Sequence, residues 1–312
     1  MHADTLFFPP NEPPMKYVRL LYLLAIPLIL TACGSDDKEE DVVIEINNNQ
    51  NPTMTCPEAN RLEFPHLKGG NNLVIVHKTD HNTVVNYTVE WDCDKKSQRW
   101  SCYEMNKANT TANTSRYNGN PQYPLDPDLP LADYLDRPSE DYLIGDYFWG
   151  TGFDHGHICP SADRLYSAEA NYQTFYLTNM QPQYNIFNAG LWAMMEKQVR
   201  TWATAKGTDA LYVCKGGTID DESNILRRLS NKLIVPKYFF MALLLKNAQG
   251  YRAIAFWCEN ENVDRTNDSL SKYAISIDEL EKRTGIDFFC NLPDQTEYKV
   301  EQSYVPNVWG LR

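Results

Sequence analysis

Short runs in which hydrophobic and polar positions alternate recur along the chain from residue 72 onward. Such a period of two is typical of half-buried β-strands, particularly where Val, Ile, Tyr, Phe and Trp are frequent. The pattern predicts strands over residues 72–77, 83–92, 99–104, 174–180, 211–214, 232–235, 238–245 and 251–257.

Residues 188–205 instead follow a helical period. At about 100° per residue, Leu191, Met195, Val199 and Trp202 share one apolar arc. Strands that precede and follow one long helix predict an α+β fold with a central antiparallel sheet flanked by helices.

A second, shorter helix is predicted over residues 277–284. Asp278, Glu279 and Glu281 fall in its first turns, and Gly285 follows its last residue. Residues 107–131, by contrast, are rich in Asn, Thr, Gly and Pro and predict a long loop of the kind that often carries function.

The N-terminal region is typical of an exported protein. An apolar run at residues 20–30 follows Lys16 and Arg19, so residues 1–32 are predicted to be a signal peptide that starts at Met15. The sequence Leu-Thr-Ala before Cys33 resembles a bacterial lipobox, which implies lipidation of Cys33. An uncleaved membrane anchor is the alternative, although the run is short for a membrane span.

Residues 33–54 are acidic and then rich in asparagine, which predicts a flexible tether. Residues 55–312 then form one domain without internal repeats. The expected location is the cell envelope, with the lipid on Cys33 inserted in the outer membrane and the domain periplasmic or surface-exposed.

Composition and charge limit the classes of function that this protein can have. The 312 residues are 43% hydrophobic and 12% aromatic, which is globular rather than disordered. The net charge of −12 disfavours a protein that binds nucleic acid through overall positive charge. Residues 214–252 are locally basic, which predicts either a nucleic-acid-facing flank or an ordinary charged surface.

Seven cysteines remain beyond Cys33, an odd number, so at least one thiol stays free. Cys93 and Cys102 flank a predicted hairpin turn and are the expected disulfide pair. No Cys-x-x-Cys pair exists, which argues against a structural zinc site of the cysteine type.

The candidate chemistry is concentrated after residue 153. His155 and His157 lie two residues apart, and neutral histidine is a common general base near neutral pH. Asn188, Glu196 and Arg200 lie along one flank of the predicted helix. Amide and carboxylate oxygens suit Mg²⁺, and an arginine can grip a phosphate. This set fits metal-assisted attack of water on a phosphodiester.

Each residue also has a simpler interpretation. Asn188 could be a helix cap, and Glu196 with Arg200 could be a solvated ion pair. His155 and His157 could bind Zn²⁺ as part of a zinc enzyme, although no third ligand is evident.

The order of these motifs resembles the DNA/RNA non-specific endonuclease family, a His-Me finger (ββα-metal) class. That family carries Asp-Arg-Gly-His, then Asn-x-x-Pro-Gln, then Asn-x-Gly-x-Trp, with Glu and Arg further along the helix. The matching residues here are Asp154, Gly156, His157, Asn179, Pro182, Gln183, Asn188, Gly190, Trp192, Glu196 and Arg200.

The resemblance implies a metal-dependent, sugar-non-specific endonuclease of DNA and RNA. His157 would be the general base, and Asn188 the direct protein ligand of one Mg²⁺, for which Mn²⁺ can substitute. Glu196 would act on this metal through a water molecule, and Arg200 would contact the scissile phosphate or leaving group.

Three further residues follow from the resemblance. Asn179 would support the site, and Arg116 matches an upstream phosphate-binding arginine. His155 replaces the family's arginine, and protonated His155 would substitute for it only in part. The alternative is therefore a catalytically impaired, nuclease-fold surface lipoprotein that binds nucleic acid. Both interpretations imply DNA and RNA as partners without sequence specificity, a membrane contact through Cys33 and no obligate protein partner.

Overall fold

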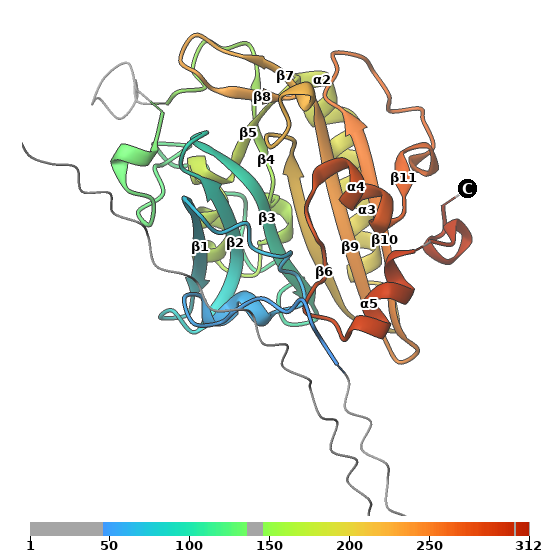
Figure 1. The fold of residues 1–312 in the computed structure, drawn as a ribbon. Helices are drawn as coiled ribbons and strands as arrows, with labels where there is room; N and C mark the ends of the chain where they lie inside the picture. Colours follow the sequence, from blue (N-terminus) through green and yellow to red (C-terminus); the bar gives the residue numbers. More distant parts are fainter. Residues whose placement is uncertain (1–45, 136–145, 303, 312) are drawn as a thin grey trace, which may run out of the picture. The chain divides into compact units, whose positions relative to one another are not determined.

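The computed structural model describes residues 46–135, 146–302 and 304–311, which all belong to one compact unit. Its main feature is a seven-stranded antiparallel sheet in the order β1-β2-β3-β6-β9-β10-β11 (Figure 1). The strands are β1 (Asn72–Thr79), β2 (Val84–Asp92), β3 (Ser97–Asn106), β6 (Thr208–Gly217), β9 (Tyr238–Asn247), β10 (Gly250–Glu259) and β11 (Ala274–Ile275).

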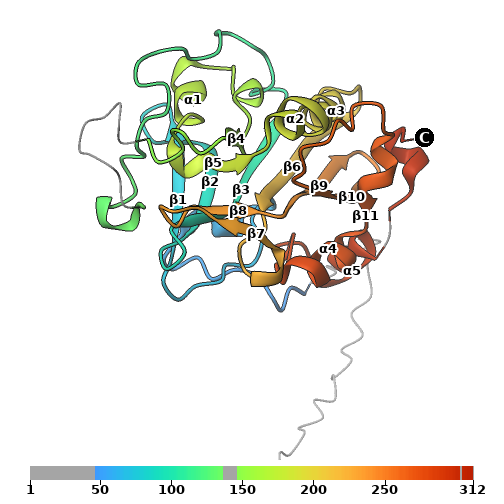
Figure 2. The same cartoon turned by 90° about the horizontal axis from the view of Figure 1, so that it is seen from above.

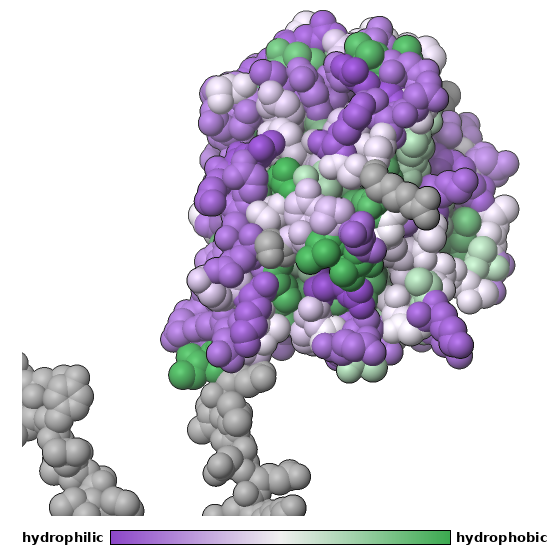
Figure 3. Space-filling view, turned by 90° about the vertical axis from the view of Figure 1, so that its right-hand side faces the viewer, coloured by the Kyte–Doolittle hydropathy of each residue, from purple (hydrophilic) through white to green (hydrophobic). Residues whose placement is uncertain are grey.

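Helices cover the two faces of this sheet. Figure 2 shows α2 (Asn185–Phe187) and α3 (Ala193–Ala203) on one face, and α4 (Ile277–Thr284) and α5 (Asp294–Glu301) on the other. Two hydrophobic clusters fill these two interfaces, one containing Met195 of α3 and the other containing Leu280 of α4. Seen from the side that lies at the right in Figure 1, the surface is mostly polar with a small central group of apolar residues (Figure 3).

Two two-stranded sheets, one short helix and several 3-10 turns make up the rest of the described fold. Strand β4 (Asp154–His157) pairs with β5 (Met180–Gln183), and β7 (Ile225–Arg228) pairs with β8 (Ile234–Pro236). Helix α1 (Ala168–Gln173) lies between β4 and β5 in sequence. The order β4, β5, α3 is the ββα arrangement, and it stands on an antiparallel sheet flanked by helices, as the sequence predicts.

The predicted boundaries of most elements are close to the observed ones. Helix α4 begins after Ser276, whose hydroxyl accepts a hydrogen bond from the Glu279 backbone N–H. It ends at Gly285, which has φ of +67°, a conformation that glycine adopts without strain.

The predicted strand over residues 174–180 is wrong. The described chain forms turns there, and strand β5 begins only at Met180. Polar side chains satisfy the local backbone: Thr174 Oγ1 donates to the Asn171 carbonyl, and Asn179 Nδ2 donates to the Thr174 carbonyl. A short buried apolar run does not by itself distinguish such a turn from a strand.

The tether predicted over residues 33–54 ends earlier than expected. Asn51 is buried, and its side chain donates to the carbonyls of Ala59 and Pro65. Asn47 Nδ2 donates to the carbonyls of Cys290 and Leu292. The asparagine-rich stretch therefore packs onto the C-terminal part of the domain, because its amides satisfy carbonyl groups there.

The predicted pairing of Cys93 with Cys102 is also wrong, because Cys102 lies opposite Thr88 on β2 and opposite Cys214 on β6. Cys93 follows the end of β2, and all seven described cysteines are free.

The signal peptide at residues 1–32 and the lipidation site Cys33 lie outside the described residues. Within the described part of the chain, no helix has the length and apolar character needed to cross a membrane.

Candidate active site

An open pocket of about 440 Å³ lies beside the ββα unit. Strand β4, the start of the helical segment and the loop after β3 all contribute to its wall. Its lining includes Arg116, Tyr123, Phe153, Asp154, His155, His157, Asn188 and Glu196. Five of the predicted site residues therefore meet in one pocket.

His157 ends strand β4 and presents its imidazole to this pocket. The edge of the Phe175 ring packs against the imidazole with a centroid separation of 5.0 Å. Nε2 is shielded from solvent and accepts or donates no hydrogen bond within the described part of the chain. Burial, and secondarily the positive charge of Arg116, lower the pKa of His157 to about 3. The ring is therefore neutral at physiological pH, with a nitrogen free to accept a proton.

Asn188 is held by neighbouring polar side chains. Its Nδ2 donates to Asp154 Oδ2 at 2.9 Å, and Asn185 Nδ2 donates to the same oxygen at 3.0 Å. Since the amide nitrogen is engaged, the amide oxygen is the atom that Asn188 offers to a ligand.

The simpler interpretation of Asn188 as an N-terminal helix cap is wrong, because α2 precedes it and its own backbone is helical (φ −59°, ψ −53°). The chain kinks at Gly190, which has non-helical angles (φ −97°, ψ −106°), before α3 begins.

Glu196 lies one turn into α3 and faces both the pocket and the sheet. Its Oε1 accepts a hydrogen bond from Lys215 Nζ at 2.8 Å. Lys215 is buried on β6, and its ammonium lies 4.7 Å from the centre of the Trp192 ring. Burial raises the pKa of Glu196, and the charge of Lys215 opposes this shift. Lys215 is therefore not part of the predicted basic surface at residues 214–252.

Arg200 is separate from the main pocket. Its Nη1 donates to Oδ1 of the buried Asp163 at 2.8 Å, so the predicted ion pair with Glu196 is absent. It lines an adjoining cavity of about 240 Å³ together with Lys197 and Thr201. Ala162 lines both cavities, so Arg200 lies next to the pocket rather than within it.

Asn179 does not line the pocket but contacts the chain segment that follows β4. It is fully buried, and its amide bridges both backbone groups of Cys159, accepting from N–H and donating to C=O at 2.8 Å each. These bonds fix the chain two residues after His157.

His155 occupies the position of the family's arginine, and aromatic rings hold it from both sides. It stacks on Tyr123 with a centroid separation of 3.7 Å and an interplanar angle of 2°, and on Phe148 at 4.5 Å. Its Nε2 lies 2.8 Å from Asp146 Oδ2. The zinc interpretation gains no support, because neither of the two groups of three or more potential metal ligands found among the described residues contains His155 or His157.

Arg116 reaches the pocket from the long loop after β3 and lies 4.7 Å from the centre of the Phe175 ring. At the pocket rim, Arg227 of β7 lies 4.7 Å from the centre of the Phe153 ring. Both guanidinium groups therefore add positive charge near the pocket of an acidic protein.

Sequence analysis did not identify Tyr123, Asp146, Phe148 or Lys215 as site residues. Each lies on a segment distant in sequence from β4 and α3 or outside the recognised motifs, and only the folded chain brings them together. Tyr123 lies in the loop over residues 107–131, which the sequence predicts to be of a kind that often carries function. This is the one sequence signal for Tyr123.

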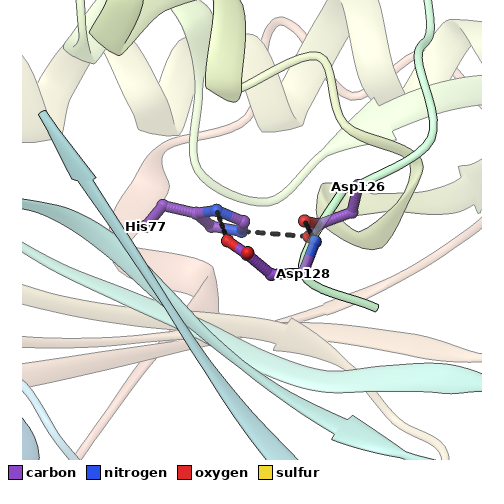
Figure 4. Close-up of side chains that lie close together, drawn as sticks. All are labelled: His77, Asp126 and Asp128. Carbon is purple, nitrogen blue, oxygen red and sulfur yellow. Dashed lines mark hydrogen bonds and ion pairs between the residues drawn. The ribbon is translucent and has the colours of Figure 1, made fainter. Parts of the chain in front are cut away.

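A second group of potential metal ligands lies outside the pocket. Figure 4 shows His77 of β1 beside Asp126 and Asp128 of the long loop. His77 Nε2 is 3.1 Å from Asp126 Oδ2, and Nδ1 is 3.9 Å from Asp128 Oδ2. None of the three lines the pocket that contains His157 and Asn188, so this group does not supply a ligand there.

Comparison with known proteins agrees with this geometry. Residues 70–295 match the DNA/RNA non-specific endonuclease family. A nuclease of Nostoc sp. is 28% identical over 69% of this chain and 75% of its own length. A nuclease of Serratia marcescens is 24% identical over 96% of this chain and 100% of its own length. Human mitochondrial endonuclease G is 30% identical over 46% of this chain and 50% of its own length.

The fold has a counterpart among solved structures. The structure of the EndoG/EndoGI complex aligns with a TM-score of 0.56 and 21% identity, covering 72% of this chain and 89% of the other. The family match extends over more than half of the chain, and the ββα unit brings four of the family's motif residues, Asp154, His157, Asn188 and Glu196, to one pocket. The chain therefore belongs to the DNA/RNA non-specific endonuclease family.

Proposed function

We propose that this protein is a Mg²⁺-dependent endonuclease that hydrolyses phosphodiester bonds of DNA and RNA, with His157 as the general base. The observation that carries this proposal is the state of His157. Its imidazole lines the pocket, and its Nε2 makes no hydrogen bond to any described residue. A neutral imidazole that makes no competing hydrogen bond is ready to accept a proton from water.

The reaction that fits the pocket is hydrolysis. Water attacks phosphorus, its proton passes to His157 Nε2, and the phosphorus–oxygen bond to the leaving group breaks. Arg116 provides a fixed positive charge on the pocket wall, where it would bind a substrate phosphate. His155, clamped between Tyr123 and Phe148, would contribute a further donor when it is protonated.

The donor set of the pocket fits a hard divalent cation. The Asn188 amide oxygen is left free because Asp154 engages the amide nitrogen, and Glu196 adds a carboxylate nearby that would act through water. Mn²⁺ prefers the same oxygen donors and would substitute for Mg²⁺. When bound, the cation would stabilise negative charge on the phosphate and the leaving oxygen.

Arg200 would contact substrate only after a change of partner, because Asp163 holds it in the adjoining cavity. Contacts to phosphates rather than to base edges would give no sequence specificity.

The lipobox at Cys33 supports a location in the cell envelope, with the domain anchored to the outer membrane through lipid.

The test incubates the protein with supercoiled plasmid and with structured RNA, in Mg²⁺ or in EDTA. We expect cleavage of both substrates in Mg²⁺ and none in EDTA, and His157→Ala should lose activity while keeping the wild-type circular dichroism spectrum. Cleavage by His157→Ala at the wild-type rate would overturn the assignment of the base. If the wild-type protein retards plasmid on a gel but does not cleave it, the proposal that this protein is an endonuclease is overturned.

A further inference from the structure

Helices α4 and α5 lie on the face of the sheet opposite α2 and α3 (Figure 2), and together they carry a group of carboxylates. Asp278 and Glu281 are one turn apart on α4, and Glu301 ends α5. One oxygen from each of these three residues lies within 4.8 Å of those of the other two. Two helices therefore converge on one point with three formal negative charges.

Glu301 is the innermost member of this group. Its exposed fraction is 7%, and its Oε1 has no hydrogen-bond partner among the described residues. A buried carboxylate oxygen without a donor is costly, because it has lost its hydration without replacement. This atom therefore requires a ligand that the protein itself does not supply.

The surroundings do not neutralise the charge. The charged groups that act most strongly on Glu281 and Glu301 are all carboxylates, including those of Asp287 and Glu297. Glu281 Oε1 accepts one hydrogen bond, from the Phe288 backbone N–H at 2.8 Å. Burial raises the pKa of Glu281 to about 8 and that of Glu301 to about 10, as expected where negative charge lacks compensation.

We propose that Asp278, Glu281 and Glu301 form a calcium-binding site that joins α4 to α5. The donors are all carboxylate oxygens, which hard cations prefer. Ca²⁺ takes about 6–8 oxygen ligands at about 2.3–2.6 Å in a flexible geometry, whereas Mg²⁺ demands near-ideal octahedral geometry at about 2.0–2.1 Å, so carboxylates that come from two separate helices suit Ca²⁺ better. Asp278 and Glu281 are only partly buried, so water can complete the coordination shell. The bound ion would fasten the C-terminal helices to each other and to the sheet.

The first experiment measures thermal unfolding of the full chain at neutral pH in EDTA, in millimolar Ca²⁺ and in millimolar Mg²⁺. We expect Ca²⁺ to raise the midpoint by several degrees and Mg²⁺ to raise it less, because an ion that binds only the folded state stabilises it by mass action. Glu301→Gln should lose the Ca²⁺-dependent shift.

Two control variants make this result specific. Glu279→Gln also removes one negative charge from α4. Because Glu279 pairs with Arg283 and does not belong to the three-carboxylate group, this variant should keep the Ca²⁺-dependent shift. Asn188→Ala removes the proposed metal ligand of the active site and should also keep the shift, which separates this site from nuclease activity.

A binding measurement covers the case in which Glu301→Gln does not fold. Calorimetric titration of Ca²⁺ into the partly exposed variant Asp278→Asn should show at least a tenfold weaker affinity than in the wild type. No Ca²⁺-dependent shift in the wild type would overturn the proposal. The proposal would also be overturned if, in EDTA, Glu301→Gln unfolded at a higher temperature than the wild type and Asp278→Asn bound Ca²⁺ with unchanged affinity. That pair of results would show that protons rather than Ca²⁺ neutralise the three carboxylates.

Discussion

Lys215 Nζ donates to Glu196 Oε1 across 2.8 Å, and this ion pair joins β6 of the central sheet to α3 at the floor of the pocket. The Lys215 side chain is 1% exposed and that of Glu196 is 14% exposed. Trp192 covers the ammonium, which lies 4.7 Å from the ring centre. The pair therefore fixes the carboxylate that would act on a metal-bound water in the proposed reaction, and Lys215 would be a positioning residue.

We expect Lys215→Met to destabilise the fold and to raise the Mg²⁺ concentration that plasmid cleavage requires. Removing one partner leaves Glu196 buried and unpaired, which typically costs about 3–5 kcal/mol. The measurements are urea unfolding and the Mg²⁺ concentration for half-maximal plasmid cleavage, which should rise. Lys215→Arg keeps the charge and should recover part of both properties. Wild-type stability and an unchanged Mg²⁺ requirement in Lys215→Met would show that the ion pair has no such role.

Asp154 provides a second test of metal positioning. Its carboxylate holds the amide nitrogens of Asn185 and Asn188, so it orients the amide oxygen of Asn188. We expect Asp154→Ala to raise the Mg²⁺ concentration needed for cleavage by about 10–100-fold, the usual effect of removing a group that orients a metal ligand. The maximal rate at saturating Mg²⁺ should fall much less. An equal loss at every Mg²⁺ concentration would instead indicate a direct role of Asp154 in catalysis.

The sequence predicts the sheet and the long helix because alternation and helical periodicity report directly on burial. It misidentifies residues 174–180, where an apolar run is buried in turns that polar side chains stabilise. Motif order identifies His157, Asn188 and Glu196, since β4 and the helical segment that contains α3 carry them as local units. It does not identify Lys215 or Asp146, because their roles depend on tertiary contacts to Glu196 and His155.

The lowered pKa of His157 predicts a pH dependence of stability. The folded protein keeps the ring neutral down to about pH 3, whereas an unfolded histidine takes up a proton near its ordinary pKa of about 6.5. Between these values the unfolded state binds more protons, so His157 makes the free energy of unfolding fall as the pH falls. The slope for one such group approaches about 1.4 kcal/mol per pH unit.

This contribution is measured by comparing the wild type with His157→Gln in urea unfolding between pH 4.5 and 7. Other groups titrate alike in both proteins and cancel in the difference. The free energy of unfolding of the wild type should decrease more steeply toward low pH. Parallel curves would mean that His157 takes up its proton at the same pH in the folded and the unfolded protein, which would contradict the lowered pKa.

The position of His155 predicts a gain of function. A neutral imidazole offers less charge than the family's arginine and no bidentate fork, and one missing transition-state donor typically costs about 10²–10³ in rate. A planar guanidinium can stack between Tyr123 and Phe148 as the imidazole does, and it can still pair with Asp146. We therefore expect His155→Arg to raise turnover at neutral pH, measured as kcat for plasmid cleavage in saturating Mg²⁺. His155→Gln, which keeps a polar side chain without charge, should show no such gain and serves as the matched control. Lower turnover in His155→Arg than in the wild type would mean that the aromatic clamp has adapted to histidine and that this position no longer serves the phosphate.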